Sequence, residues 1–447
     1  MIDIDKYISA LDKVPFARQY GKVTKAVGLV INGVGVSACI GDICKIYIRS
    51  NHKQQEIDAQ VVGFIKDEVL LMPYGDVYGI KPSDKITSTN EPLKITIGPQ
   101  LLGRTVDAFG KPIDDTETRI HYGLFDDNKR EKYSVYNPPL QPFQRNRISE
   151  PLATGIRAID GLITCGKGQR MGIFAGSGVG KSVLMGMIAR NTSADVNVIA
   201  LIGERGREVR DFIEKDLGTD GLKHSVVVVA TSDQPPLIRS MGAYTAMAIA
   251  EYFRDQGKDV LFMMDSVTRY AMAEREIGLA IGEPPTTKGY TPSVFAKLPK
   301  LLERAGATIN KGTITGLFTV LVEADDMNDP ISDSVRSILD GHIILSRDLA
   351  VRSHYPAIDV NHSLSRIMND IVKPEHVNAA NHLRETLAIY NDAKDLIDIG
   401  AYVSGNNPKI DYAIKYIDSI NDYLKQPVEE CAEFENAKKR LINLLPK

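Results

Sequence analysis

The feature that most constrains this chain is the segment 172–190, where an apolar run gives way to a glycine-rich loop and then a helical pattern. The apolar run 171–174 predicts a buried strand, and the loop reads Ala175-Gly-Ser-Gly-Val-Gly-Lys181-Ser182. Glycines let backbone N–H groups turn toward phosphates, and the helix N-terminus adds its positive dipole end; Lys181 reaches the terminal phosphates, and Ser182 can bind Mg²⁺. The strict pattern has glycine in place of Ala175, a mild departure if that residue keeps an ordinary φ. The alternative, a glycine-rich turn that merely joins a strand to a helix, is disfavoured by Gly-Lys-Ser with these flanks, so the segment predicts nucleotide binding.

The composition is that of an ordinary globular protein, with 43% hydrophobic and 25% charged residues in a chain of 447. This length predicts about three structural units, since a domain usually holds roughly 100–200 residues. The net charge of −3 lacks the basic excess of a typical nucleic-acid binder, so no nucleic-acid partner is expected. The cysteines are too few and too scattered for a disulfide framework or a metal site, and buried or idle thiols in a reducing cytosol are expected: Cys39, Cys44, Cys165 and Cys431.

The sequence carries no sign of secretion or of a membrane span. The first residues are acidic at Asp3 and Asp5 and lack the basic and apolar regions of a secretory signal. No apolar run approaches the roughly 20 residues that a spanning helix requires. We therefore expect a cytosolic protein whose contact with a membrane is peripheral.

Residues 1–20 predict a short amphipathic helix. Its apolar residues fall at helical spacing along one face: Ile4, Tyr7, Ile8 and Leu11. A helix this short is not stable alone, so the apolar face must dock on something. Docking on its own domain and docking on a partner protein are both open at this point.

The rest of the chain divides into three further regions. Residues 21–97 hold short apolar runs separated by turn signals, which predict a small closed barrel or sandwich; strands are expected at 27–30, 43–48, 60–65 and 69–72. Residues 98–372 begin with a transition segment that follows the barrel. A polar, proline-rich connection is expected on the surface at 126–147. After it, apolar strands alternate with helices such as 237–256. The expected strands are 171–174, 196–202, 226–230, 260–264, 314–322 and 342–345, which predict a mostly parallel sheet. Residues 373–447 show helical spacing, including that of Cys431, Phe434 and Leu441.

Two carboxylates follow apolar strands of this expected sheet. Asp265 ends the run 260–264, and Glu204 directly follows the run 196–202. Ligands of parallel sheets gather at the carboxyl ends of the strands, so both side chains should emerge near the phosphate loop. An Asp in this position holds Mg²⁺ in phosphate-loop enzymes, and hydrolysis needs a carboxylate that orients and deprotonates water. The plainer alternative for Glu204 is a solvated surface pair with Arg205.

Four segments together resemble the rotary and export ATPase superfamily, which includes the catalytic subunits of proton-driven ATP synthases and the ATPases of type III secretion. They are Ala-Gly-Ser-Gly-Val-Gly-Lys-Ser (175–182), Gly-Glu-Arg-Gly-Arg-Glu (203–208), Met-Asp-Ser-Val-Thr-Arg-Tyr (264–270) and Gly-Glu-Pro-Pro-Thr-Thr-Lys-Gly-Tyr (282–290). The stretch 275–306 looks most like the flagellar export ATPases, with the virulence-type export ATPases a near second. The resemblance implies an α/β RecA-like P-loop core, a small N-terminal β-barrel and a C-terminal helical domain.

The resemblance also implies site residues and cofactors. ATP and Mg²⁺ would bind at the phosphate loop and at an aromatic that packs on adenine: Gly176, Ser177, Gly178, Val179, Gly180, Lys181, Ser182, Val183 and Tyr355. Glu204 would be the catalytic carboxylate, with Arg205 supporting the phosphate end, and Ser182 and Asp265 would hold the metal. Arg366 would be the arginine that a neighbouring subunit inserts. From the residues alone, Tyr355 could equally be a core aromatic and Arg366 a surface arginine.

The function implied is a homo-hexameric ATPase that energises or delivers substrates for type III flagellar protein export at the inner face of the membrane. Its implied partners are a stator-like regulator bound through residues 1–20, a central-stalk-like protein, the export gate and chaperone–substrate complexes. A virulence-type export ATPase and the catalytic subunit of a proton- or sodium-driven ATP synthase are the alternative enzymes. A non-catalytic ring subunit is disfavoured by Glu204, and a ring helicase is disfavoured by the acidic charge balance.

Overall fold

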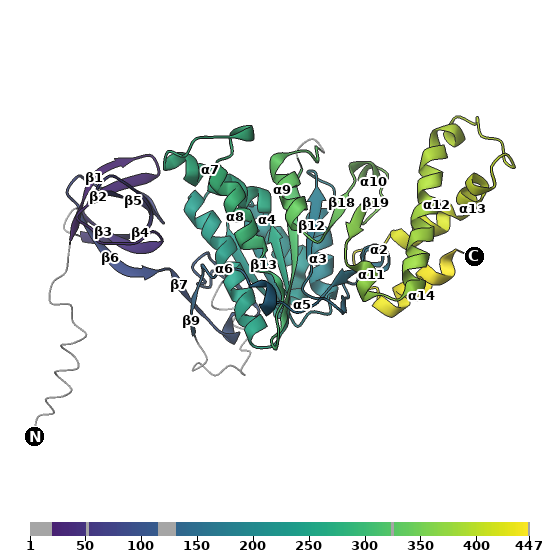
Figure 1. The fold of residues 1–447 in the computed structure, drawn as a ribbon, viewed down its shortest axis with the longest axis horizontal. Coiled ribbons are helices and arrows are strands. Elements are labelled where there is room, and N and C mark those ends of the chain that lie inside the picture. Colours follow the sequence, from purple (N-terminus) through teal and green to yellow (C-terminus); the bar gives the residue numbers. More distant parts are fainter. Residues whose placement is uncertain (1–19, 51–52, 115–130, 323–325, 446–447) are drawn as a thin grey trace, which may run out of the picture. The chain divides into compact units, whose positions relative to one another are not determined.

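The computed structural model describes residues 20–50, 53–114, 131–322 and 326–445 (Figure 1). The amphipathic helix predicted at residues 1–20 therefore lies outside the described residues, apart from Tyr20. The described chain divides into a smaller and a larger compact unit: the smaller includes the chain up to Lys94, and the larger contains the phosphate loop and the helical C-terminal region. Among the described residues, none of the helices combines the length and the apolar composition that a membrane-spanning helix needs.

The smaller unit contains a closed six-stranded barrel, with strand order β1-β2-β5-β4-β3-β6. Its antiparallel strands are β1 (Gly21–Val27), β2 (Val30–Val34), β3 (Asp42–Ser50), β4 (Lys53–Ile65), β5 (Glu68–Pro73) and β6 (Lys85–Pro92). Alternate residues such as Ile46 and Ile86 fill its interior, as the period-2 pattern of strands requires. The strand expected at 27–30 is wrong: this segment is the turn between β1 and β2, where Gly28 has a φ of +58°.

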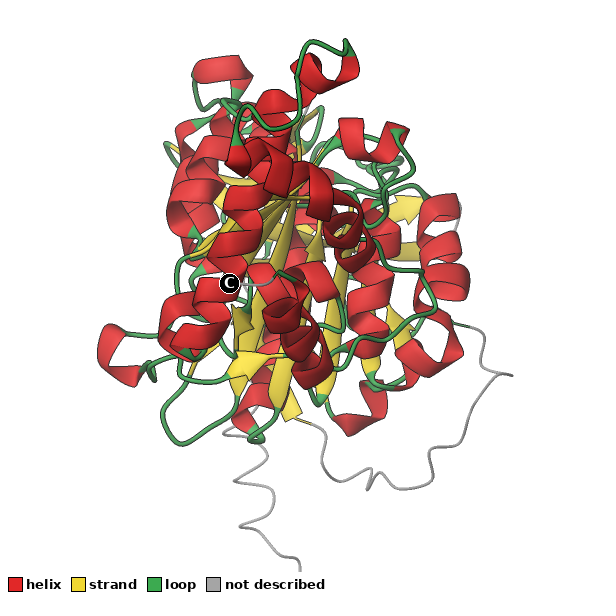
Figure 2. Ribbon diagram, turned by 90° about the vertical axis from the view of Figure 1, so that its right-hand side faces the viewer, coloured by secondary structure: helices red, strands yellow, loops and turns green. Residues whose placement is uncertain are grey.

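The larger unit is built on a nine-stranded sheet with the order β19-β18-β12-β17-β15-β13-β14-β8, and β16 (Gly306–Ala307) pairs with β17. All six expected strands are present in it: β12 (Arg170–Ala175), β13 (Val196–Ile202), β14 (Ser225–Ala230), β15 (Asp259–Asp265), β17 (Thr313–Leu321) and β18 (Gly341–Leu345). These six are parallel, with β8 (Arg104–Val106) added in parallel at one edge and β19 (Ile358–Ser365) antiparallel at the other. Figure 2 shows the strands side by side among the surrounding helices.

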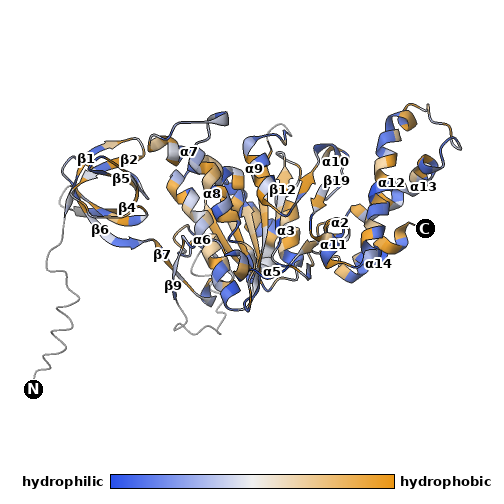
Figure 3. Ribbon diagram, in the orientation of Figure 1, coloured by the Kyte–Doolittle hydropathy of each residue, from blue (hydrophilic) through white to orange (hydrophobic). Residues whose placement is uncertain are grey.

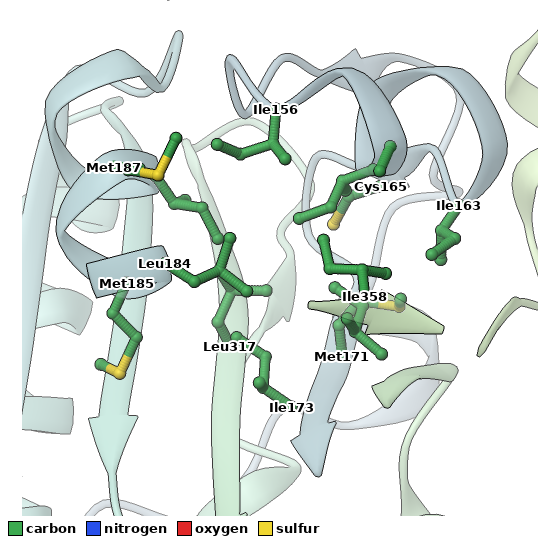
Figure 4. Packing of buried hydrophobic residues seen from close by; sticks show 14 of the residues in the cluster. Ile156, Ile163, Cys165, Met171, Ile173, Leu184, Met185, Met187, Leu317 and Ile358 are labelled. Atoms are coloured by element: carbon green, nitrogen blue, oxygen red, sulfur yellow. The ribbon is translucent and has the colours of Figure 1, made fainter. Parts of the chain in front are cut away.

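Helices connect the strands and cover the sheet. The longer ones are α3 (Lys181–Asn191), α6 (Pro236–Asp255), α7 (Val267–Ala280), α8 (Pro292–Leu302) and α9 (Pro330–Ile338). Shorter helical segments are α2 (Arg157–Leu162), α4 (Gly206–Asp211), the π-helix η5 (Phe212–Leu217), α5 (Gly218–Lys223), α10 (Arg347–Val351) and α11 (Met368–Ile371). The central strands are apolar along their length (Figure 3), and Leu184 and Met187 of α3 belong to the same buried cluster as Ile173 and Leu317 of the sheet (Figure 4).

The polar connection expected on the surface at 126–147 is described from residue 131 onward, and part of it is buried. It forms β9 (Glu131–Ser134), which pairs with β7 (Lys94–Ile97). Val135 is fully buried, and its carbonyl accepts a hydrogen bond of 2.8 Å from Arg304. Arg304 is itself fully buried and forms a two-armed ion pair with Glu251, with N–O distances of 2.7 Å. This segment is therefore attached to the sheet domain by a buried polar network, which its polar composition did not indicate.

The C-terminal region is helical, as expected, with α12 (Pro374–Asp398), α13 (Pro408–Leu424) and α14 (Phe434–Leu444). Cys431, expected at helical spacing with Phe434, instead precedes α14. Arg157 of α2 attaches this region to the sheet domain: its Nε donates to the Tyr423 carbonyl at 2.9 Å, and its guanidinium forms an ion pair with Glu430.

The segment after α13 also contacts the backbone of Tyr355, through Gln426. The Gln426 side chain accepts a hydrogen bond from the Arg157 backbone N–H at 2.9 Å. The backbone N–H of Gln426 then donates to the carbonyl of Tyr355, also at 2.9 Å. The position of the Tyr355 backbone is thus set by the helical C-terminal region.

Candidate nucleotide-binding and catalytic site

The phosphate loop lies between β12 and α3. Ala175 is the last residue of β12, and its carbonyl accepts a hydrogen bond of 3.0 Å from the Val322 backbone, so it has the ordinary strand conformation that an alanine adopts. Gly178 and Gly180 have φ values of +78° and +89°, a region that side chains with a Cβ rarely adopt. Helix α3 begins at Lys181, so its unpaired N-terminal N–H groups face the loop. This arrangement can bind phosphate groups.

Three predicted site residues meet beside the loop. The Lys181 ammonium forms an ion pair with Oδ1 of Asp265 and lies 3.9 Å from Oε1 of Glu204. All three side chains are largely buried, with exposed fractions of 12%, 6% and 13%. The hydroxyl of Thr319 donates a hydrogen bond of 2.8 Å to Oδ1 of Asp265. A cation and two carboxylates therefore converge in a desolvated cluster.

The order of the strands explains why these residues meet. β12, β17, β15 and β13 are consecutive parallel neighbours, so the loop and both carboxylates all lie at the carboxyl ends of these strands. Gly203 follows β13 with a φ of +71°, and a Cβ there would lie 2.8 Å from the side chain of Arg269. This position therefore requires glycine, and the turn it forms sends Glu204 into the cluster rather than toward solvent.

The electrostatic environment of Glu204 suits a proton acceptor. Burial and, to a smaller degree, the charge of Asp265 raise the pKa of Glu204, Lys181 opposes both, and the resulting pKa is about 7. Oε1 of Glu204 is buried and has no hydrogen-bond partner. Partial burial raises the pKa of Glu208, but its hydrogen bonds with Glu204 and Arg205 outweigh this, and the net pKa is lowered. Glu204 is thus a carboxyl group with a pKa close to neutrality, as a general base requires.

Arg205 is not brought to this cluster. Its side chain is 75% exposed and forms an ion pair of 2.8 Å with Glu208. The surface pair of Glu204 with Arg205, the plainer alternative, does not form either, because Glu204 points toward Lys181. Arg205 can reach a phosphate only if its side chain leaves Glu208.

Tyr355 lies against the phosphate loop. A Cβ placed on Gly180 would be 3.5 Å from Cε1 of the Tyr355 ring. The residue is 45% exposed, so it is not a core aromatic. An exposed aromatic ring at this position can pack on a nucleotide base.

Arg366 lies beside the amino end of β18, whereas the phosphate loop lies beside the carboxyl end of the same strand. Ser365 pairs with Gly341 at the start of β18, whereas Ala175 pairs with Leu345 at its end. With a rise of about 3.3 Å per residue, these positions are at least ~13 Å apart along the strand. Arg366 is exposed, and its backbone N–H donates to Asp340. This arginine is therefore placed away from its own phosphate loop.

The oxygen donors at the loop fit a magnesium ion that binds together with a nucleotide. Ser182 supplies a hydroxyl in the first turn of α3, and Asp265 supplies a carboxylate at the adjoining strand end. Among the described residues, no group of three or more His, Cys, Asp or Glu could hold a metal alone. Mg²⁺ is commonly bound by one or two protein ligands together with phosphate oxygens and water. Ser182 and Asp265 can supply the protein ligands.

Sequence reasoning missed Thr319, Glu208 and Arg269. Thr319 lies inside a strand that was correctly expected, and its only signal was a polar residue in an apolar run. Glu208 ends the segment 203–208, where only Glu204 and Arg205 had been singled out. Arg269 packs on Gly203 and carries a buried Nε without a hydrogen-bond partner.

A phosphate loop at the end of a central parallel strand, with two carboxylates on neighbouring strand ends, defines a P-loop ATPase domain. Comparison with known families agrees with this class. Residues 155–365 match the ATP synthase alpha/beta family nucleotide-binding domain, residues 23–90 match the beta-barrel domain of that family, and residues 372–443 match the T3SS EscN ATPase C-terminal domain.

Full-length relatives define the family more closely. The chain is 53% identical to a flagellum-specific ATP synthase of Bacillus subtilis, over 98% of each chain, and 49% identical to a type 3 secretion system ATPase of Xanthomonas euvesicatoria, over 96% of this chain and 94% of that one. The assembled ATPase EscN of the enteropathogenic E. coli type III secretion system has a TM-score of 0.86 at 45% identity, covering 95% of this chain and 99% of that one. The chain belongs to the family of flagellum-specific ATP synthases and type III secretion ATPases.

Proposed function

We propose that this chain is the ATPase subunit of a type III protein export apparatus, and that it hydrolyses ATP to energise or deliver export substrates. The observation that carries the proposal is the buried cluster of Lys181, Glu204 and Asp265 beside the phosphate loop. The C-terminal match to an export ATPase domain supports export over ATP synthesis, since the two activities share the nucleotide-binding domain.

In this mechanism each residue has a defined task. Lys181 leaves Asp265 and binds the terminal phosphates, and the backbone N–H groups of Gly178 and Gly180 bind their oxygens. Glu204 orients water and accepts its proton as the water oxygen bonds to the γ-phosphorus and the bond to the β–γ bridging oxygen breaks, releasing ADP and phosphate. Ser182 and Asp265 would hold a magnesium ion, which would supply positive charge against the phosphates. Tyr355 packs on the adenine ring.

The site is completed by a neighbouring subunit. Arg366 lies too far from its own loop to reach the nucleotide bound there, and an inserted arginine stabilises charge on the transferring phosphoryl group. A chain with a phosphate loop on one face and Arg366 on another forms heterologous contacts, which close into a ring. The related ATPase EscN has been solved as an assembled ATPase and in complex with its central stalk EscO, which supports an oligomer with a stalk-like partner; the oligomer that we propose is a homo-hexamer.

The remaining partners follow from the family and from residues 1–20. The amphipathic stripe of this segment would bind a stator-like regulator that restrains the ATPase and brings it to the export gate. Chaperone–substrate complexes are further proposed partners. We therefore propose that the protein acts in the cytoplasm, associated peripherally with the inner face of the membrane.

Flagellar export is the first candidate, because the stretch 275–306 looks most like the flagellar export ATPases. Virulence-type export is the second candidate. The products of the neighbouring genes distinguish the two, since each apparatus is built from its own set of structural proteins.

The proposal is tested with Glu204→Gln, which keeps the size of the side chain and removes the base. We expect Mg²⁺-dependent ATP hydrolysis to be lost while nucleotide binding persists. Glu214→Gln is the control, because Glu214 is exposed and pairs with Arg210 on the surface. Wild-type turnover in Glu204→Gln would show that Glu204 is not the base.

A further inference from the structure

Thr319 lies on the strand between the phosphate-loop strand and the Asp265 strand. Thr319 pairs with Ile173 of β12. The residue before it, Phe318, pairs with Met264 of β15, which directly precedes Asp265. The side chain is completely buried, and its hydroxyl donates to Asp265 at 2.8 Å. A buried hydroxyl in the middle of an apolar strand destabilises the strand unless it is paired, and here the partner is the proposed metal carboxylate.

Lys181 and Thr319 both contact the same oxygen, Oδ1, of Asp265. The proposed function requires Lys181 to leave this oxygen when it moves to the phosphates of a nucleotide. Asp265 is buried, so its carboxylate would then lose its cation in a desolvated place. The hydrogen bond from Thr319 does not depend on the nucleotide, and it still fixes Oδ1 after Lys181 has moved.

We propose that Thr319 is a positioning residue that holds Oδ1 of Asp265, so that the other oxygen of this carboxylate is presented to the magnesium ion of a bound nucleotide. This inference rests on the proposed function and deepens it. Thr319 does not touch the nucleotide; it acts through Asp265. Groups that orient a metal ligand in this way typically contribute about tenfold to hundredfold in metal affinity.

The test is Thr319→Val, which keeps the shape of the side chain and removes only the hydroxyl. Calorimetry on the full-length protein measures the dissociation constant of ADP with Mg²⁺ and with EDTA, and ADP avoids any dependence on hydrolysis. We expect the ratio of the dissociation constant in EDTA to that with Mg²⁺ to fall by about tenfold or more. ADP affinity in EDTA should be unchanged, and Thr319→Ser, which restores the hydroxyl, should recover the wild-type ratio.

The matched control is Thr315→Val on the same strand. Thr315 is equally buried, but its hydroxyl accepts a hydrogen bond of 2.8 Å from Gly168, toward the other edge of the sheet. This variant should leave the ratio unchanged even if its melting temperature falls. In an Asp265→Asn background, Thr319→Val should lower the ratio no further, because the two residues act in one chain of contacts.

The outcomes separate this inference from the proposed function. A wild-type protein in which Mg²⁺ does not tighten ADP binding overturns the metal site itself. A wild-type ratio in Thr319→Val overturns only the role of Thr319. Equal loss of affinity with and without Mg²⁺, or failure of Thr319→Ser to recover the ratio, shows a merely structural role and overturns it as well.

Discussion

Replacing Glu204 by glutamine should stabilise the nucleotide-free protein at pH 8 while it abolishes hydrolysis. The carboxyl group of Glu204 lies in a desolvated place beside Asp265, which raises its pKa from 4.5 to about 7. A carboxyl group with a raised folded-state pKa favours the folded state below its unfolded pKa. That contribution is lost as the pH rises through the folded pKa, because the folded protein must then hold a charge that water solvates better. Glutamine cannot ionise and avoids this loss.

The size of the effect follows from the shift. A change of one pKa unit corresponds to about 1.4 kcal/mol, so a shift from 4.5 to about 7 destabilises the protein by at most about 3.5 kcal/mol at pH 8. The hydrogen bond with Glu208 works in the opposite direction, because the pKa of Glu208 is lowered. We therefore expect Glu204→Gln to gain about 2 kcal/mol at pH 8 and well under about 1 kcal/mol at pH 5.

Urea unfolding of the nucleotide-free, metal-free protein, followed by circular dichroism, measures this difference; the chain contains no tryptophan for fluorescence. The control is Glu214→Gln, whose exposed side chain should give no gain at either pH. Two results would refute the reasoning. One is a Glu204→Gln protein no more stable than the wild type at pH 8, and the other is a gain of equal size at both pH values.

Four further predictions concern assembly, binding and stability. Mixing inactive Arg366→Ala subunits with inactive Lys181→Ala subunits should restore some ATP hydrolysis, and activity per subunit should rise with protein concentration; concentration-independent activity of a verified monomer would contradict the shared site. Tyr355→Ala should weaken ATP binding by about 1–3 kcal/mol, measured by calorimetry, whereas Tyr355→Phe should not. Deleting residues 1–20 should abolish co-purification with the regulator and leave the melting temperature and the ATPase activity nearly intact; a large fall in melting temperature would show that the stripe packs on its own barrel. Arg304→Met should lower the free energy of unfolding by about 3–5 kcal/mol, because it leaves a buried carboxylate unpaired.

The central strands could be predicted because strands buried on both faces must be apolar throughout, as in the run 196–202. The edge strands could not. β8 has only three residues, too few for a periodic pattern, and β19 has one face partly open to solvent. Its sequence therefore includes polar residues such as Asn361 and His362. The local sequence pattern therefore predicted the central strands of the sheet but not the edge strands β8 and β19.

The candidate site shows the same limit. Glu204 and Asp265 could be found because each follows an apolar run, and the ends of parallel strands meet. Thr319 could not be found, because it lies near Asp265 only if β17 is placed between β12 and β15. That strand order is set by the connections between the strands and not by the local sequence. The family resemblance implied that Arg205 supports the phosphate end, yet this residue precedes the first turn of α4 and its side chain is turned to solvent.

The attachment of the helical C-terminal region has a consequence for protein engineering. A boundary near residue 373 suggests that this region could be exchanged between relatives as a module. However, Arg157 lies more than two hundred positions earlier in the chain and contacts Tyr423 and Glu430, and the backbone of Gln426 contacts Tyr355. A chimera cut at the boundary would join a guanidinium from one parent to carbonyls and a carboxylate from the other. Successful exchange therefore requires that α2 be transplanted together with the C-terminal helices, as two separate pieces of one interlocking unit.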